Sequence, residues 1–262
     1  MKTFIDMDIV AYRCAASCEP TKIKDYREPL DLAILRTDEL LNRILAETEA
    51  DEYVGWISGS ENFRKLLYPL YKANRDQIRR PAYLQHVREF LVSEWGAKVT
   101  TGYEADDAIG IAWDGSGILC SIDKDFKQLP GRHYNFVTFE WDEVSDLQAD
   151  RNFWISMLIG DRSDNVPGIP GIGKAKAPRF FDSRDQSEWK SGVKELYEQY
   201  DLDFDLNYDL LHILRNEEEW YNIENKLSQK QRTAAPEDNG GSYPRIISGV
   251  DRTGCSFYFY GR

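Results

Sequence analysis

Short apolar segments alternate with helical patterns over the first 125 residues of this 262-residue chain. Alternation of this kind is typical of a mainly parallel sheet covered by helices, so the sequence predicts an α/β fold. Apolar and β-prone runs predict strands at the start of Lys2–Tyr12 and at Asp51–Ser58, Lys98–Thr101 and Gly117–Ile122. Apolar residues at helical spacing predict helices at Leu30–Glu47, Pro81–Trp95 and Glu104–Trp113.

The second half of the chain has a different composition. A helix is predicted at Phe153–Ile159, and the Gly- and Pro-rich segment Gly160–Lys176 follows it. Gln231–Gly241 is polar and indicates a linker, whereas Tyr243–Tyr260 contains aromatic and alternating pieces typical of a hairpin. We therefore divide the chain into residues 1–150, a small helical region at 151–228, and a linker and tail of unknown role at 229–262.

Composition excludes several classes of protein. No apolar run approaches the roughly 18 residues that a membrane-spanning helix needs, and Met1–Val10 already contains Asp6 and Asp8. We therefore expect a cytoplasmic protein without a signal peptide, located in the host cytoplasm if a phage encodes it. The cysteines lack a CxxC pair or a zinc-binding spacing, which favours reduced thiols at Cys14, Cys18, Cys120 and Cys255.

Charge is distributed unevenly along the chain. The net charge is −12, which by itself argues against nucleic-acid binding. Asn62–Phe90, however, holds seven basic and two acidic residues, a local charge of about +5. Asp185–Asn225 holds twelve acidic and three basic residues, about −9. The basic segment is either a solvated helix face or a surface that binds an anion.

Acidic residues follow apolar segments at four separate places: Asp6 with Asp8, then Glu104 with Asp106 and Asp107, then Asp123 with Asp125, and Asp161 with Asp164. If they meet at one sheet edge, each pair at 4 Å repels by roughly 4 kcal/mol at an effective dielectric of 20. Such a group needs cations, and oxygen ligands select Mg²⁺ or Mn²⁺. Two such ions would form a clamp for phosphodiester hydrolysis. Each acidic group taken alone is also explained as a helix-capping or turn residue.

A glycine-rich turn follows the last acidic group. Pro167–Lys174 (PGIPGIGK) resembles the hairpin of a helix-hairpin-helix element, whose backbone amides approach a phosphate closely. Basic side chains at Lys174, Lys176 and Arg179 accompany it, with no acidic residue between Asp164 and Asp182.

These blocks together resemble the flap-endonuclease-like 5′-nucleases, especially the phage 5′-to-3′ exonucleases and the 5′-nuclease domain of bacterial DNA polymerase I. The resemblance covers roughly residues 4–180, with a weaker likeness near Ile213–Leu227. It is carried by Asp6, by YKANR (Tyr71–Arg75), by YEADDAIG (Tyr103–Gly110) with SIDKDFKQL (Ser121–Leu129), and by GDRSDNVPGIPGIGKAKA (Gly160–Ala177).

The resemblance implies a PIN-like nuclease domain at 1–150 with a short basic arch at 62–90, and a helix-hairpin-helix (H3TH) module at 151–228. Lys72 and Arg75 are the implied catalytic pair. The implied first metal group is Asp6, Glu104, Asp106 and Asp107, with Asp8 as an additional candidate ligand. The implied second group is Asp123, Asp125, Asp161 and Asp164. The expected DNA contacts are Arg64, Lys65, Arg79, Arg80, Gly168, Gly171, Gly173, Lys174 and Lys176.

One feature departs from the family pattern. Family members have a further aspartate in the strand ahead of the arch, whereas Ile57–Glu61 (ISGSE) has Gly or Ser there. Asp8 or Glu61 is a candidate to compensate. The connection from Arg75 to the helix near Pro81 is also too short for a long helical arch. Phe63 and Tyr83 either stack on an unpaired base or pack in the core.

The expected activity is Mg²⁺- or Mn²⁺-dependent 5′-to-3′ exonucleolytic trimming of duplex or nicked DNA. Flap cutting and removal of RNA from RNA–DNA hybrids are further candidate activities. The alternatives are a catalytically weakened, structure-specific DNA-binding protein and a toxin-like ribonuclease. We expect a monomer with replication proteins as candidate partners, no membrane association, two metal ions, and K⁺ as a candidate ion at the helix-hairpin-helix.

Overall fold

Strand β1 (Lys2–Asp6) is central to the sheet that organises the first half of the chain. In the described part of the chain, six strands form this sheet in the order β3-β2-β1-β4-β5-β6. All neighbouring pairs are parallel except β5 with β6. The mainly parallel α/β prediction is therefore confirmed. The remaining strands of the sheet are β2 (Glu52–Ile57), β3 (Lys98–Val99), β4 (Ile118–Cys120), β5 (Gly131–Asn135) and β6 (Glu140–Val144).

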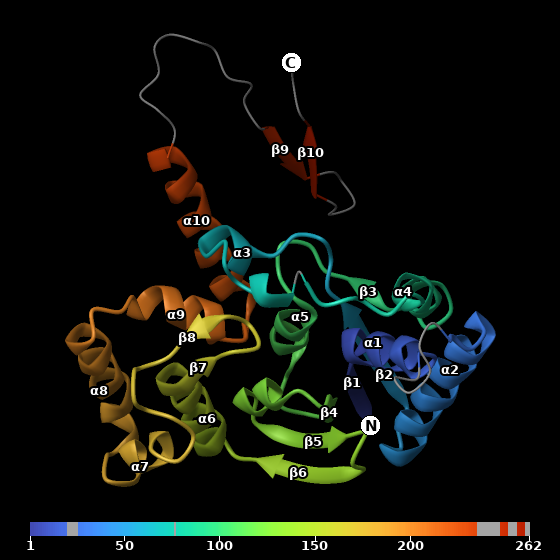
Figure 1. Cartoon of the computed structure of the whole chain (residues 1–262), viewed down its shortest axis with the longest axis horizontal. Coiled ribbons are helices and arrows are strands. Elements are labelled where there is room, and N and C mark those ends of the chain that lie inside the picture. Colours follow the sequence, from blue (N-terminus) through green and yellow to red (C-terminus); the bar gives the residue numbers. More distant parts are fainter. Residues whose placement is uncertain (20–25, 76, 235–246, 251–255, 260–262) are drawn as a thin grey trace. The chain divides into compact units, whose positions relative to one another are not determined.

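The structure is a computed structural model that describes residues 1–19, 26–75, 77–234, 247–250 and 256–259 (Figure 1). The chain divides into two units, Met1–Glu224 and Asn225–Arg262. Within the second unit, β9 (Ile247–Val250) and β10 (Ser256–Phe259) pair antiparallel, which confirms the expected terminal hairpin. The division at residue 150 falls inside the first unit and stays a prediction.

Helices cover both faces of the sheet. On one face, α1 (Met7–Ser17), α2 (Leu30–Glu47) and α4 (Leu84–Ser93) bury a core against the strands. On the other face, α5 (Ala105–Ala112) packs Ile109 against Phe4 and Leu119. β1 is consequently buried on both sides, with Ile5 in the first core and Phe4 in the second.

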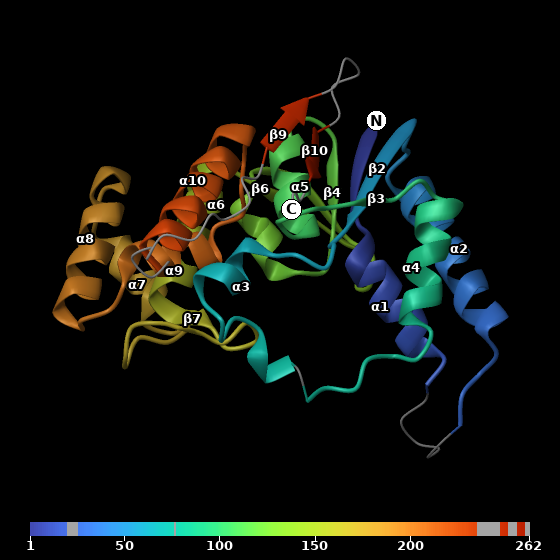
Figure 2. The same cartoon turned by 90° about the horizontal axis from the view of Figure 1, so that it is seen from above.

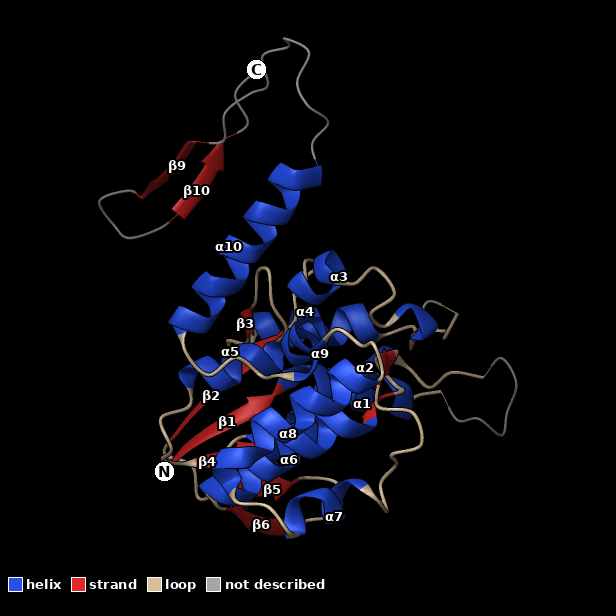
Figure 3. Ribbon diagram, turned by 90° about the vertical axis from the view of Figure 1, so that its left-hand side faces the viewer, coloured by secondary structure: helices blue, strands red, loops and turns tan. Residues whose placement is uncertain are grey.

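The helices after residue 145 have their own core. Phe153 and Trp154 of α6 (Asp146–Ile159) pack with Phe181 and Trp189 in one buried cluster. Helix α8 lies along α6, and α6 to α9 gather together in Figures 1 and 3. These helices therefore share a buried cluster within the first unit, and a separate helical region at 151–228 stays a prediction. The other elements of this part of the chain are α7 (Ala177–Asp182), α8 (Gln186–Gln199) and α9 (Phe204–Leu211), with the short strands β7 (Gly160–Asp161) and β8 (Val166–Pro167).

Several elements differ from the sequence expectation. The first strand ends at Asp6, because the Asp6 carboxylate accepts a hydrogen bond from the Ile9 amide and starts α1 at once. The segment after α3 (Phe63–Leu67) is irregular except for the 3₁₀ turn η1 (Ala73–Arg75), so the described residues contain no long arch helix (Figure 2). Helix α10 (Glu217–Ala234) occupies the start of the predicted linker, whose residues 235–241 lie outside the described part.

Two further sequence expectations concern cysteines and membranes. Cys14, Cys18 and Cys120 are free and buried, whereas Cys255 lies outside the described residues. Among the helices that the structure describes, none combines the length and apolar character needed to cross a membrane.

Gly110 makes the contact between α5 and the chain after α9 possible. A Cβ added there would lie 2.2 Å from the Leu214 carbonyl oxygen. We expect Gly110→Ala to lower the free energy of unfolding by about 1–3 kcal/mol, because the backbone must shift to admit the methyl group. Urea denaturation measures this change. Gly173→Ala is the control, since its Cβ would meet no atom within 4 Å, and an equal loss in both variants would contradict the prediction.

Candidate active site

The site begins where β1 and β4 end. Asp6 is buried at the last position of β1, and its Oδ2 accepts a hydrogen bond from the Ser121 hydroxyl at 2.9 Å, directly after β4. Asp123 caps the 3₁₀ helix η2 (Lys124–Gln128) by accepting from the Asp125 amide at 3.0 Å. Adjacent parallel strands therefore bring Asp6 and the SIDKDF segment to one edge of the sheet, as predicted.

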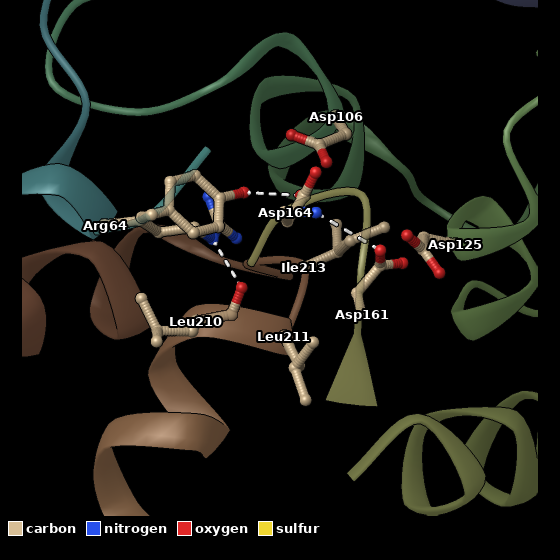
Figure 4. Close-up of a pocket in the computed structure, with 9 residues that line it drawn as sticks. Arg64, Asp106, Asp125, Asp161, Asp164, Leu210, Leu211 and Ile213 are labelled. Atoms are coloured by element: carbon tan, nitrogen blue, oxygen red, sulfur yellow. Dashed lines mark hydrogen bonds between the residues drawn. The ribbon is translucent and has the colours of Figure 1, made fainter. Parts of the chain in front are cut away.

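Four carboxylates line one pocket beside this edge. Asp106 comes from the first turn of α5 and Asp125 from η2, whereas Asp161 ends β7 and Asp164 lies in the β7–β8 turn. Their carboxylates face a common space in Figure 4. Four acids that are up to 58 positions apart in the sequence thus meet in one pocket.

Basic side chains lie among these carboxylates. Lys72 pairs with Glu104 and has its Nζ 3.6 Å from Asp164, which also pairs with Arg75. Lys124 Nζ lies 2.9 Å from Asp161 and 3.9 Å from Asp125. The Tyr71 hydroxyl lies 2.7 Å from Glu104 and 3.0 Å from Asp164, so it links the two acidic groups.

This internal pairing determines the state of the site. Across the described residues, no three Asp, Glu, His or Cys side chains stand close enough to hold one metal ion together. Lys72 lies between Glu104 and Asp164, Lys124 lies between Asp125 and Asp161, and Arg75 pairs with Asp164. Sequence reasoning missed Tyr71 and Lys124, although both lie inside the quoted motifs.

The paired and unpaired acids differ in protonation. Burial would raise the pKa of Glu104, but Lys72 and Arg64 outweigh it and lower that pKa to about 2. Burial likewise opposes ionisation of Asp161, yet hydrogen bonds from Ser163 and Lys124 hold its pKa below the ordinary value. These two carboxylates are therefore ionised without any added cation.

Three other acids show the opposite shift. Burial and the neighbouring Asp8 raise the pKa of Asp6 to about 7. Burial and Asp123 raise the pKa of Asp125 to about 7, and burial with Asp107 and Glu104 raises the pKa of Asp106 well above its usual range. Crowded carboxylates of this kind are stabilised in their ionised form by a cation.

Asp8 has a different position from the one expected of a metal ligand. Its carboxylate pairs with Arg88 of α4 and accepts a hydrogen bond from the Ser58 amide at 2.8 Å. Arg88 also donates to the Ser58 carbonyl. Asp8 therefore holds the end of β2, where the family acid is missing, and it does not line the pocket.

Two predicted site residues are held in a buried ion pair, of which Arg64 lines the pocket. Asp107 is fully buried and Arg64 is 2% exposed, and the two form a bidentate pair at 2.6 and 2.8 Å. Arg64 was expected to contact DNA, but its guanidinium is enclosed by protein, so the structure gives it an internal role. Phe63 is also buried and packs against Trp220, which favours core packing over base stacking.

The other expected DNA contacts are mostly exposed. Gly168 differs from the others because it has a packing role. A Cβ there would lie 2.2 Å from the Ile159 carbonyl carbon, so this glycine lets the hairpin pack on α6. The Arg79 guanidinium lies 3.7 Å from the Glu19 carboxylate, and its side chain is 72% exposed. Residues on the surface are Lys65, Arg79, Arg80, Gly171, Gly173, Lys174 and Lys176.

Relatives of this chain are named as nucleases. A protein named flap endonuclease Xni from Shewanella sp. (strain MR-4) is 29% identical over 193 residues, which are 67% of this chain and 66% of that relative. A 5'-3' exonuclease of Buchnera aphidicola is 31% identical over 134 residues, 44% of this chain and 47% of that one. The predicted resemblance to the flap-endonuclease-like 5′-nucleases is confirmed. No protein-family model matches the chain.

Solved structures show the same fold. The T5 D15 protein co-crystallised with metal ions superposes with a TM-score of 0.58 at 14% identity, covering 87% of this chain and 98% of that one. A T5 D15 flap endonuclease in a complex with DNA and metal ions gives a TM-score of 0.58 at 16% identity, covering 88% and 97% of the two chains. The chain therefore shares the fold of these T5 proteins.

The Asp8–Arg88 pair gives a test of its structural role. A double-mutant cycle with Asp8→Asn and Arg88→Met should show a coupling of about 1–2 kcal/mol in unfolding free energy, because a partly buried charged hydrogen bond is broken. The control cycle uses Lys127 and Asp142, whose side chains are 48% and 49% exposed and whose coupling should stay below about 1 kcal/mol. Equal couplings in the two cycles would show that Asp8 has no special structural role.

Proposed function

We propose that this chain is a divalent-metal-dependent 5′-nuclease that removes nucleotides from the 5′ end of duplex or nicked DNA. The observation that carries the proposal is the pocket in which Asp106, Asp125, Asp161 and Asp164 meet beside Lys72 and Arg75. Acids that could bind hard cations and bases that could bind a phosphate lie within one site. The similarity to flap endonucleases and 5'-3' exonucleases supports this activity.

The donor set fits Mg²⁺ or Mn²⁺, because the pocket offers four carboxylates from three chain segments. The raised pKa values of Asp6, Asp106 and Asp125 support the fit, since these crowded carboxylates lack enough positive charge. When bound, such ions activate water and stabilise the leaving oxygen. The residues proposed to hold them are Asp6, Glu104 and Asp106 on one side and Asp123, Asp125, Asp161 and Asp164 on the other.

Lys72 and Arg75 are proposed to hold the scissile phosphate. Both pair with pocket acids in this structure, and Arg75 is 47% exposed, so its guanidinium is accessible to a ligand. Cations that neutralise Glu104 and Asp164 would free both side chains to bind a phosphate. Positive groups aimed at the reacting phosphate stabilise the charge that develops on it during hydrolysis.

The hairpin after α6 is proposed to grip the duplex. Its exposed Gly171 and Gly173 leave backbone groups open, and Lys174 and Lys176 add charge beside them. Contacts of this kind bind phosphates and do not read bases. We therefore propose DNA binding without sequence preference, with RNA–DNA hybrids, flap cutting and K⁺ at the hairpin as further proposals.

One observation favours a second candidate, a DNA-binding protein with weakened catalysis. Where the family has a strand acid, Gly59 packs so closely on Thr100 that a Cβ would lie 2.1 Å from its carbonyl oxygen. The position therefore cannot hold an acid without backbone movement. Asp8, the nearest substitute, is already paired with Arg88.

Cleavage of end-labelled DNA separates these functions. Nicked and 5′-flap duplexes labelled at either end should release short 5′ products with Mg²⁺ or Mn²⁺ and none with EDTA. Asp161→Asn should lower the rate by about 100-fold or more, the scale of losing one electrostatic contact to the transition state. Asp142→Asn, an exposed acid on β6, is the control and should cleave normally.

Binding without cleavage under either metal would favour the DNA-binding candidate. A preference for single-stranded RNA over both duplexes would instead favour a ribonuclease.

The ion pair between Lys124 and Asp161 gives a separate prediction. Lys124→Met should raise the affinity for Mn²⁺ about two- to fivefold, because one exposed ion pair of roughly 0.5–1 kcal/mol no longer competes for Asp161. Electron paramagnetic resonance of free Mn²⁺ measures the binding. Lys127→Met is the matched control, since Lys127 lies on the same 3₁₀ helix but pairs with Asp142 outside the pocket. Lower or unchanged affinity in Lys124→Met would contradict the competition.

A further inference from the structure

Every hydrogen-bonding position of the Asp107 carboxylate is already occupied. Its Oδ1 accepts from Arg64 Nη2 at 2.8 Å and from the Leu214 amide at 3.0 Å. Its Oδ2 accepts from Arg64 Nη1 at 2.6 Å and from the Glu104 amide at 3.1 Å. A carboxylate has about four lone-pair positions, so a fully buried Asp107 has none left for a metal ion.

Arg64 is equally committed. Its Nε donates to the Leu210 carbonyl at 3.0 Å, and Nη2 donates to the His212 carbonyl at 2.7 Å (Figure 4 draws the Leu210 contact). Together with Asp107 and a 3.5 Å contact to Glu104, these bonds use all five N–H groups of the guanidinium. Lysine could not replace this arrangement, because its three donors lack the planar fork.

The pair joins three segments that are far apart in the sequence. Arg64 lies on α3 at the start of the basic segment and Asp107 lies in the first turn of α5, whereas residues 210–214 span the end of α9 and the chain after it. Asp107 also fixes the Glu104 amide in the capping box that starts α5. The Glu104 carboxylate and the neighbouring Asp106 therefore take their positions from this buried pair.

We propose that Asp107 is not a metal ligand in this chain and that Arg64 and Asp107 act as a positioning pair, which fixes Glu104 and Asp106 at the pocket and ties α3 to the chain after α9. The proposal rests on the proposed nuclease function for its catalytic consequence, and on the hydrogen bonds alone for its structural one. It reassigns two residues that the family resemblance places with the metal and the DNA.

Stability and Mn²⁺ binding test the two roles separately. Arg64→Met or Asp107→Leu alone should lower Tm by about 10 °C or more, because each leaves a buried charge unpaired. The double variant should recover most of this loss, since an apolar pair replaces the ion pair. Its affinity for Mn²⁺ should stay within about threefold of wild type, whereas the comparison variant Asp106→Asn, which removes a pocket carboxylate, should lose about tenfold or more.

A double variant that binds Mn²⁺ as weakly as Asp106→Asn would overturn the proposal, as would simple addition of the two Tm losses.

If the apolar variants do not fold, Arg64→Lys is measured in their place, because this variant keeps the buried positive charge. Measured at least 10 °C below its Tm, it should lower kcat for a nicked duplex about tenfold or more and leave KM within about twofold. A raised KM with normal kcat would instead show Arg64 to be a DNA contact and overturn the proposal. The Tm comparison of the single and double variants tests the Arg64–Asp107 pair even if the wild-type protein cleaves no DNA. Failure of the proposed nuclease function is therefore distinguishable from failure of this proposal.

Discussion

Buried carboxylates repel one another unless positive charge lies between them, and this constraint governs the arrangement around the pocket. Glu104, Asp161 and Asp164 each have a basic partner from another segment of the chain. Asp6, Asp106 and Asp125 do not have enough positive charge nearby, and their pKa values rise accordingly. The basic side chains of the protein thus neutralise one half of the acids, and an added cation would neutralise the other half.

The same pairing ties the segments together. Lys72 and Arg75 belong to the irregular segment after α3, and they reach acids of α5 and of the β7–β8 turn. Behind them, the Arg64–Asp107 pair joins α3, α5 and the chain after α9 with hydrogen bonds that leave no donor unused. Electrostatic contacts therefore hold the basic segment against the pocket, together with the buried packing of Tyr71 against Val166 and Leu210.

The sequence predicted these strands because β2 and β4 contain short apolar runs and β1 carries the apolar pair Phe4 and Ile5, and it predicted α2 from its helical periodicity. It missed α1 because Asp6 acts both as the end of a strand and as a helix cap, which no periodicity shows. It missed the β5–β6 pair because residues 140–143 of β6 are exposed and mostly charged. Edge strands of this kind lack the apolar pattern that identifies buried ones.

The candidate site was predictable in its acids and less so in their partners. Motif blocks identified Asp106, Asp125, Asp161 and Asp164, and the structure brings these four together. No local pattern could show that Arg64 turns inward, because its partners lie 40 to 148 positions away. For the same reason the sequence could not show that Asp8 is held by Arg88, 80 positions along the chain.

Anomalous diffraction from crystals soaked in Mn²⁺ would test directly whether the pocket completes its charge with a divalent cation. Manganese should appear beside Asp106, Asp125 and Asp161, with the Lys124 ammonium displaced from the Asp161 carboxylate. Asp107 should keep its four hydrogen bonds and lie outside the metal's coordination shell. A pocket that stays empty at millimolar Mn²⁺ with Lys124 still on Asp161, or a metal bound to Asp107, would contradict this arrangement.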